Sequence, residues 1–193
     1  MIHSLENIFE KIIEIKREGL TSFLNEVPTL LKEAYDDPNF SKSIIFPKLK
    51  GENYSRKLLI SDEIIGPAIW AISWPNSSYA PPHNHNGEAC VNYIAKGDLL
   101  VRDYKEIKRG EKYELNLINT EIKSSGDSIG IDPRINNVHS INSLSESQSL
   151  HVYPSYYENS EIFEFSEFSK KYNGLDLYIK KRINLSKEEE YEN

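Results

Sequence analysis

The feature that most constrains the fold is a series of short β-prone runs between residues 57 and 153. Turn-forming glycine, proline, asparagine, aspartate and serine residues separate these runs at near-regular intervals. Many short strands with this spacing favour a mainly β fold, either a closed or nearly closed antiparallel barrel or a jelly roll. The tripeptide Lys96-Gly97-Asp98 predicts a hairpin between two of the runs. The runs cover residues 57–61, 68–74, 90–95, 99–104, 113–122, 128–131, 138–142 and 149–153.

Residues 1–40 have a helical pattern instead. Their apolar residues recur on one helical face, first in residues 5–13 and again in residues 23–34, before Asp36-Asp37-Pro38 stops the pattern. We expect two or three short helices that pack outside the barrel. A chain of 193 residues with 38% hydrophobic residues can bury one substantial core. We therefore expect one domain, 1–193, with its barrel core at 54–155 and a charged, disordered tail at 186–193.

The charge of the chain limits its partners. The formal net charge is −7, and no basic stripe is present, so we expect neither a nucleic-acid nor an anionic-membrane partner. No apolar run approaches the length of a membrane span, and the first residues lack the pattern of a secretory leader. The single cysteine excludes an intrachain disulfide and suits a reducing compartment. We expect a cytoplasmic protein, whether monomer or homo-oligomer.

Histidines form the clearest chemical pattern. His83 and His85 are two residues apart, and His139 and His151 follow far downstream in β-prone segments. Side chains at i and i+2 of an extended strand point to the same side, so both imidazoles can reach one ion. The spacing predicts a metal site assembled from distant strands. Imidazoles bind iron, zinc, copper or nickel, so the ligands alone leave the metal open.

The spacing of His83-x-His85, Cys90 and Gly97 resembles the first motif of the cupin superfamily. In that motif two histidines and an acidic residue bind metal, whereas here Cys90 occupies the acidic position. The resemblance implies a cupin-type antiparallel barrel. The later residues Gly126, Pro133, His139 and Asn142 resemble the second cupin motif, whose histidine completes the metal site.

A cysteine in the acidic position is similar to the cysteine dioxygenase family. Three further elements agree with this resemblance, which runs from residue 54 to residue 153. They are Tyr54-Ser55-Arg56, Trp74 nine residues before His83, and Ser149-Leu150-His151-Val152-Tyr153. The resemblance implies an enzyme that uses one Fe²⁺ per chain, held by His83, His85 and His139, to convert L-cysteine and O₂ to cysteine sulfinate.

The same resemblance implies roles for the other residues. Arg56 would bind the substrate carboxylate through its planar fork. Tyr153 would place its hydroxyl near bound oxygen, with His151 and then Ser149 behind it on the same strand face. Cys90 would be the partner of Tyr153 in a thioether crosslink, and Tyr54 and Trp74 would belong to the same pocket.

Several alternatives stay open at this point. Cys90 could be a small buried hydrophobic residue, Arg56 a surface ion-pairing residue and Tyr153 ordinary core. Glu88 could act as a fourth metal ligand, which would favour a cupin isomerase with Glu88 as its proton-transferring base. A dioxygenase for 3-mercaptopropionate or cysteamine, and a non-catalytic cupin that binds a small ligand, are the other readings.

Overall fold

The computed structural model describes residues 4–49, 51–62, 66–135, 138–156, 159–166 and 176–184. The predicted tail at 186–193 and His3 lie outside these residues. Within them, three helices precede eleven strands, which confirms a mainly β fold with helices at its N-terminal end. The helices are α1 (Leu5–Glu18), α2 (Leu20–Asp36) and α3 (Pro38–Ser43). The strands are β1 (Ser55–Ser61), β2 (Ala68–Trp74), β3 (Tyr79–Asn84), β4 (Cys90–Lys96), β5 (Asp98–Arg109), β6 (Lys112–Ser124), β7 (Ser128–Ile131), β8 (Val138–Ser143), β9 (Ser147–Tyr153), β10 (Asn159–Phe165) and β11 (Leu177–Asn184).

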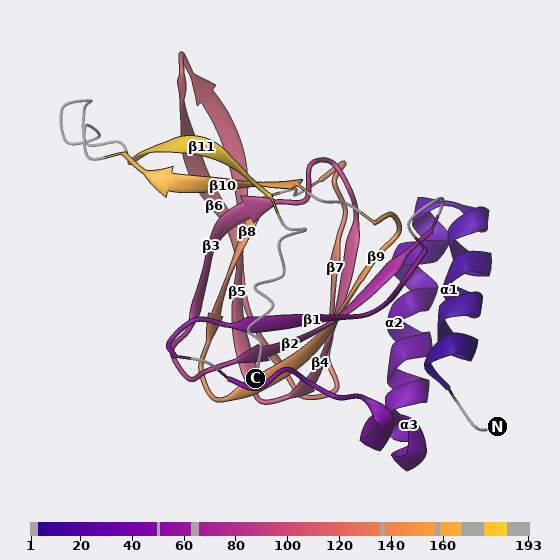
Figure 1. The fold of residues 1–193 in the computed structure, drawn as a ribbon. Helices are drawn as coiled ribbons and strands as arrows, with labels where there is room; N and C mark the ends of the chain where they lie inside the picture. Colours follow the sequence, from indigo (N-terminus) through magenta and orange to yellow (C-terminus); the bar gives the residue numbers. More distant parts are fainter. Residues whose placement is uncertain are drawn as a thin grey trace.

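The strands form two antiparallel arrangements. One is a five-stranded sheet in the order β1-β2-β9-β4-β7. The other is a closed ring in the order β10-β11-β6-β5-β8-β3. Figure 1 shows them facing each other, with β10 and β11 across the upper end. The predicted antiparallel barrel is therefore present, with a second sheet laid against it.

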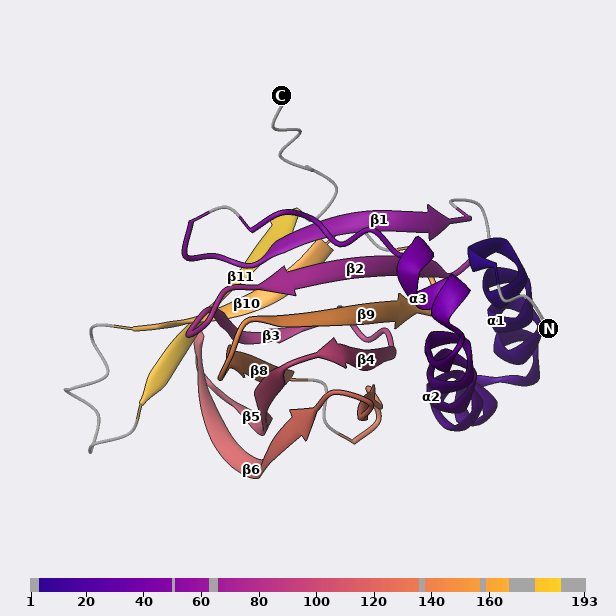
Figure 2. The same ribbon diagram turned by 90° about the horizontal axis from the view of Figure 1, so that it is seen from below.

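The helices cover the outer face of the five-stranded sheet. Ser4 caps α1 by accepting a hydrogen bond from the Asn7 backbone N–H at 3.2 Å, and Gly19 (φ 111°) joins α1 to α2. The apolar faces of α1 and α2 share one buried cluster with outward-facing residues of β2, β4 and β9, among them Ile69, Val91 and Val152. Figure 2 shows both helices at one end of these strands.

Alternation along the same strands builds a second core between the sheets. On β2, Trp70, Ile72 and Trp74 point inward, between residues that face the helices. On β4 and β9, Cys90 and Tyr153 belong to this inner cluster as well. Because strand side chains alternate with a period of two, Ser149 and His151 share the inner face with Tyr153. The period of two thus places Ser149, His151 and Tyr153 on the face of β9 that points to the barrel interior.

The predicted hairpin at Lys96-Gly97-Asp98 is wrong. β4 pairs with β7 and β9, whereas β5 pairs with β6 and β8, so Gly97 (φ 78°) carries the chain from one sheet to the other. A Cβ at Gly97 would overlap Ser147 Oγ and lie 2.7 Å from the Glu146 carbonyl oxygen. The close approach of this second loop adds a reason for glycine beyond its positive φ. Turn residues indicate a change of direction but do not determine which strands pair.

Three strands lie outside the eight predicted runs. β3 contains Pro81 and Pro82, which weaken any strand prediction because proline lacks a backbone N–H. β10 and β11 follow residue 155, where the predicted barrel core ends, and β10 pairs with both β11 and β3. The C-terminal segment therefore closes the ring directly beside the strand that carries His83.

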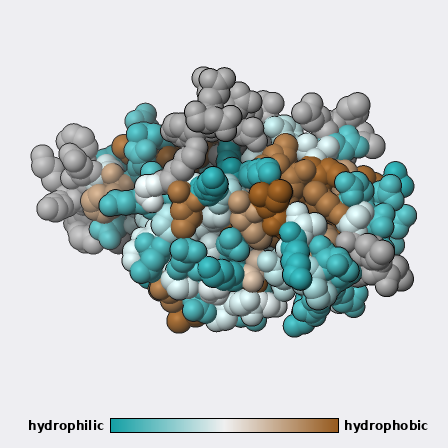
Figure 3. All heavy atoms as spheres, turned by 60° about the horizontal axis from the view of Figure 1, so that its bottom comes forward, coloured by the Kyte–Doolittle hydropathy of each residue, from teal (hydrophilic) through white to brown (hydrophobic). Residues whose placement is uncertain are grey.

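Figure 3 shows a band of apolar surface among hydrophilic side chains on the lower face. Exposed apolar residues include Ile45 and Leu49, between α3 and β1, and Leu117, Ile118 and Ile122 on β6. In the described part of the chain, no helix has the length and apolar character needed to cross a membrane.

Candidate metal centre

A bulge in β3 turns His83 toward the barrel interior. Ala80 pairs with Ile141 and His83 pairs with His139, so three steps along β3 match two steps along β8. The irregularity falls at Pro81 and Pro82, which have no N–H to contribute to a ladder. With regular alternation, residues three apart would face opposite sides of the sheet. The bulge lets both Ala80 and His83 face inward.

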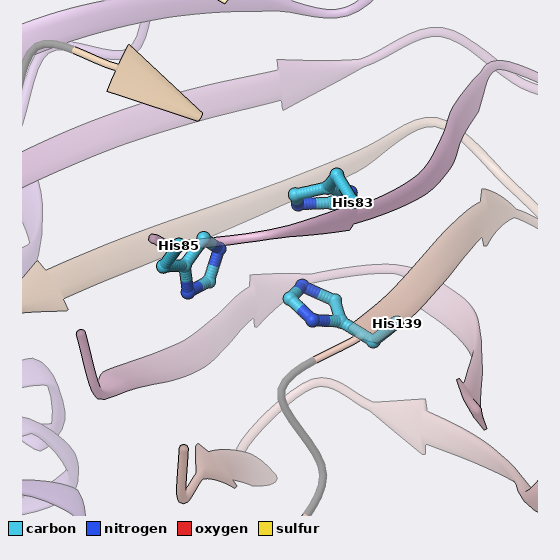
Figure 4. Close-up of side chains that lie close together, drawn as sticks. All are labelled: His83, His85 and His139. Atoms are coloured by element: carbon cyan, nitrogen blue, oxygen red, sulfur yellow. The ribbon is translucent and has the colours of Figure 1, made fainter. Parts of the chain in front are cut away.

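His83, His85 and His139 converge on one point. Their ring nitrogens include one from each residue that all lie within 4.8 Å of one another. The ring centroids of His83 and His139 are 4.3 Å apart, and those of His85 and His139 are 4.9 Å apart. Figure 4 shows the three rings facing a common space. His83 lies on β3, His85 is the residue after that strand, and His139 lies on β8. The i, i+2 pair and the distant third histidine meet as predicted.

Burial keeps these imidazoles neutral. It lowers the pKa of His83, although a hydrogen bond with the Pro81 carbonyl acts in the opposite direction. Burial, reinforced by the neighbouring histidines, holds the pKa values of His85 and His139 well below the usual range. His83 Nδ1 lies 2.8 Å from the Pro81 carbonyl oxygen, which can only accept. His83 therefore carries its proton on Nδ1 and presents the lone pair of Nε2.

The donor set fits a divalent transition metal. Neutral imidazoles are the form that binds metal, and three of them gather here with their ligand nitrogens within 4.8 Å of one another. His139 Nδ1 is buried and has no hydrogen-bond partner among the described residues, as expected for an atom reserved for another ligand. Three imidazoles suit iron, zinc, copper or nickel. His83, His85 and His139 are thus the residues that would hold the metal.

Glu88 lies elsewhere. Among the described residues, the cluster that could hold a metal contains three histidines and no carboxylate. Glu88 Oε2 accepts a hydrogen bond from Ser155 Oγ at 3.3 Å. Glu88 also lines a cavity of about 290 Å³ next to the turn between α1 and α2, together with Phe23 and Pro154. The arrangement does not support Glu88 as a fourth ligand.

A buried relay joins Trp74, Ser149 and His151. Trp74 Nε1 donates to Ser149 Oγ at 2.8 Å, and Ser149 Oγ lies 2.9 Å from His151 Nε2. Because an indole can only donate, the Ser149 oxygen accepts from Trp74, and the same hydroxyl forms a second hydrogen bond with His151 Nε2. Burial, with smaller contributions from His83 and Arg56, lowers the pKa of His151 to about 3.

Cys90 and Tyr153 meet beside the histidines. The Cys90 thiol is fully buried and shares a side-chain hydrogen bond with Tyr153. Burial raises the pKa of the thiol, and this hydrogen bond only partly opposes the effect. The Tyr153 ring stands at 90° to that of His85 with a centroid separation of 5.1 Å. Cys90 is therefore buried, as expected of a small hydrophobic residue, but it also contacts Tyr153, the residue expected as its thioether partner.

Arg56 lies on the same inner face. Its guanidinium carbon is 4.8 Å from the Trp70 ring centroid, a cation–π distance. Its charge lowers the pKa of Tyr54, against the larger raising effect of burial. The Tyr54 ring packs on Trp74 at 4.8 Å between centroids. Arg56 therefore packs against the residues that surround the site.

Two contributors were not foreseen. Asn92 follows Cys90 at i+2, and its Oδ1 accepts a hydrogen bond from Cys90 Sγ at 2.8 Å. The period of two that linked Ser149 to Tyr153 would have placed Asn92 on the inner face as well. Trp70 supplies the platform under Arg56 and shows no local signal beyond its inward position on β2.

Comparisons with known proteins show likeness to solved structures only. No protein family matches the sequence, and no curated protein matches it. An RmlC-like cupin from Shewanella frigidimarina is similar at 14% identity and a TM-score of 0.45, over 61% of this chain and 88% of that chain. An RmlC-like cupin protein from Desulfovibrio desulfuricans is similar at 12% identity and a TM-score of 0.43, over 56% of this chain and 88% of that chain. An oxalate oxidase is similar at 16% identity and a TM-score of 0.43, over 55% of this chain and 53% of that chain. The metal centre is therefore defined by the geometry of its three histidines.

Proposed function

We propose that this protein is an iron-dependent thiol dioxygenase that converts L-cysteine and O₂ to cysteine sulfinate. The observation that carries the proposal is the contact of Cys90 with Tyr153, whose ring stands against His85 in the three-histidine cluster. A metal centre that only binds an ion has no need of this pair. The resemblance of these residues to the cysteine dioxygenase family supplies the reaction.

The three histidines leave a strongly attractive site for an anionic substrate. Neutral imidazoles do not reduce the charge of a bound divalent ion, whereas a carboxylate ligand would. Ferrous iron at this position would supply open coordination positions for a small thiolate and for O₂. His83 and His139 are linked through adjacent strands, so they hold their imidazoles on the rigid part of the barrel.

Arg56 is proposed to select substrates with a carboxylate. Its planar fork can bind both carboxylate oxygens, and its position over Trp70 limits the directions in which the fork can point. Cysteine and 3-mercaptopropionate carry that carboxylate, whereas cysteamine does not. Tyr54 and Trp74 would form the wall of the pocket beside it.

Tyr153 is proposed to donate its hydroxyl proton as a hydrogen bond to reacting oxygen, and His151 to support it. The Trp74–Ser149 pair holds the His151 ring in place through its Nε2 atom. Cys90 Sγ and the ring of Tyr153 are the proposed thioether partners. That bond replaces one S–H and one C–H bond, and O₂ is the oxidant that takes up the two hydrogens. We also propose a cytoplasmic location, on the basis of charge and cysteine content.

Oxygen uptake tests the proposal directly. Protein loaded with Fe²⁺ is given L-cysteine, with cysteamine and 3-mercaptopropionate in parallel, and the products are identified by mass spectrometry. We expect cysteine sulfinate in amounts that match the oxygen consumed. Absence of uptake with every thiol at full iron occupancy would overturn the dioxygenase, and preference for another thiol would change the substrate alone.

A further inference from the structure

Asn84, the last residue of β3, lies between His83 and His85 and has its own fixed environment. It is 3% exposed, although its neighbours are the residues that face the metal centre. Its Nδ2 donates to Glu161 Oε2 at 2.8 Å, and its Oδ1 accepts from the Asn86 backbone N–H at 2.9 Å. Both ends of the amide are therefore hydrogen-bonded: Nδ2 holds Asn84 to Glu161, and Oδ1 holds the turn from residue 84 to residue 86.

Glu161 connects Asn84 to the C-terminal strands. Glu161 and Asn84 are register partners in the β10–β3 ladder, and Ile162 is opposite His83. Lys180 of β11 places its Nζ 3.1 Å from Glu161 Oε2 and 3.1 Å from Glu106 Oε2. Burial raises the pKa of Glu161, but the hydrogen bonds from Asn84 and Lys180 outweigh it, so the pKa is lowered overall. The carboxylate stays ionised next to the lysine.

Lys180 is itself held in place. Its Nζ lies 4.6 Å from the centroid of the Tyr113 ring and 5.0 Å from that of Phe163, and its side chain is 17% exposed. An ammonium between two aromatic faces and two carboxylates has few alternative positions. The chain of contacts therefore runs from β6 and β11 through Glu161 to Asn84.

His85 depends on this anchor more than His83 does. β3 ends at Asn84, and the chain then turns through Asn86 (φ 55°) and Gly87 (φ 85°). His83 is paired directly with His139, but His85 has left the ladder. Two hydrogen bonds hold the turn after the strand: Asn86 N–H donates to Asn84 Oδ1, and Glu88 N–H donates to the His85 carbonyl oxygen.

We propose that Asn84 and Glu161, with Lys180 behind them, form a positioning unit that fixes the separation of His83 and His85 for metal binding. The inference rests on the metal centre of the proposed function, but it does not depend on which reaction the centre performs. Groups that orient metal ligands commonly change metal affinity by about 10- to 100-fold when removed. The C-terminal strands thus act on a site to which they contribute no ligand.

Cobalt titration of the full-length apoprotein tests this inference. Co²⁺ affinity is measured by calorimetry, and the visible absorption of the bound ion reports its ligand geometry. The variants are Asn84→Ala, Glu161→Ala and Glu161→Gln. Glu164→Ala is the matched control, because Glu164 lies on the same strand and pairs with Lys181 of β11 but has no contact with Asn84.

We expect Glu161→Ala and Asn84→Ala to weaken Co²⁺ binding by about 10- to 100-fold and to alter its absorption band. Glu161→Gln keeps an oxygen that can accept from Asn84 Nδ2, so it should restore most of the affinity. Glu164→Ala should bind as the unmodified protein does. Unchanged affinity in both Glu161 variants, or an equal loss in Glu164→Ala, would overturn the inference while leaving the metal centre intact. Failure of the unmodified protein to bind cobalt would overturn the metal centre itself.

Discussion

The neutral state of His151 makes the metal-free protein sensitive to acid. The folded-state pKa of His151 is lowered to about 3, mainly by burial, whereas an unfolded histidine titrates near 6.5. A pKa that is depressed by folding contributes stability that is fully present above about pH 6.5 and is lost as the pH falls toward the folded-state value. Acidification should therefore destabilise the apoprotein well before carboxylates titrate.

The size of the effect follows from the two pKa values. Between pH 7.5 and pH 5.0 the unfolded imidazole takes up a proton and the folded one does not, which costs about 2 kcal/mol of unfolding free energy. His151→Gln removes this titration but keeps an amide oxygen that can accept from Ser149. Protonation of the other buried histidines lowers the unfolding free energy in the same direction in both proteins. The unmodified protein should therefore lose about 2 kcal/mol more than the variant over this pH range.

Urea unfolding at the two pH values, in the presence of a chelator, measures the difference. Trp70 and Trp74 are both buried, so their fluorescence reports unfolding. The quantity compared is the loss of unfolding free energy between the two pH values in each protein, so the cost of the substitution itself cancels. Equal loss of stability in the unmodified protein and in His151→Gln would refute the claim that burial keeps His151 neutral.

Four further outcomes follow from the site. His139→Ala should lose bound iron because two imidazoles remain, and metal analysis after desalting checks this; stoichiometric iron would exclude His139 as a ligand. Arg56→Ala should raise KM for L-cysteine by about 10-fold or more while leaving KM for cysteamine nearly unchanged, and equal effects would remove the carboxylate-binding role. Cys90→Ser should abolish a mass deficit of two hydrogens in protein purified from cells and keep its iron, whereas a deficit that persists would place the crosslink elsewhere. Trp74→Phe should cost about 1–3 kcal/mol of unfolding free energy, because Ser149 loses a buried donor, and a change below about 0.5 kcal/mol would contradict the relay.

Sequence patterns with a short period were sufficient to predict much of the fold and of the site. The shared face of Ser149, His151 and Tyr153 depends only on the alternation of side chains along β9, whereas His85 lies one residue beyond the end of β3. This alternation survives in the structure wherever the pairing is regular. The N-terminal helices likewise follow from apolar residues at helical spacing, and α2 ends at Asp36, where the sequence predicts a stop.

The features that sequence patterns missed depend on long-range pairing. Nothing local to Gly97 indicates that the strands on either side of it belong to different sheets. Strand β3 was obscured by Pro81 and Pro82, whose unfavourable backbone is tolerated at a bulge. In β10 and β11 the charged residues Glu161 and Lys180 weaken the apolar signal, although their contacts with each other and with β3 hold the strands in place.

The bulge in β3 separates two demands that a regular strand would couple. Upstream of it, Ala80 must face inward to fill the core; downstream, His83 must face inward to bind metal. In an unbroken ladder, residues at this odd spacing could not meet both requirements, and any shift that improved one would disturb the other. The extra residue gives the two halves of β3 separate registers against β8. Substitutions that change the packing of the apolar interior therefore need not rotate the imidazoles away from the metal.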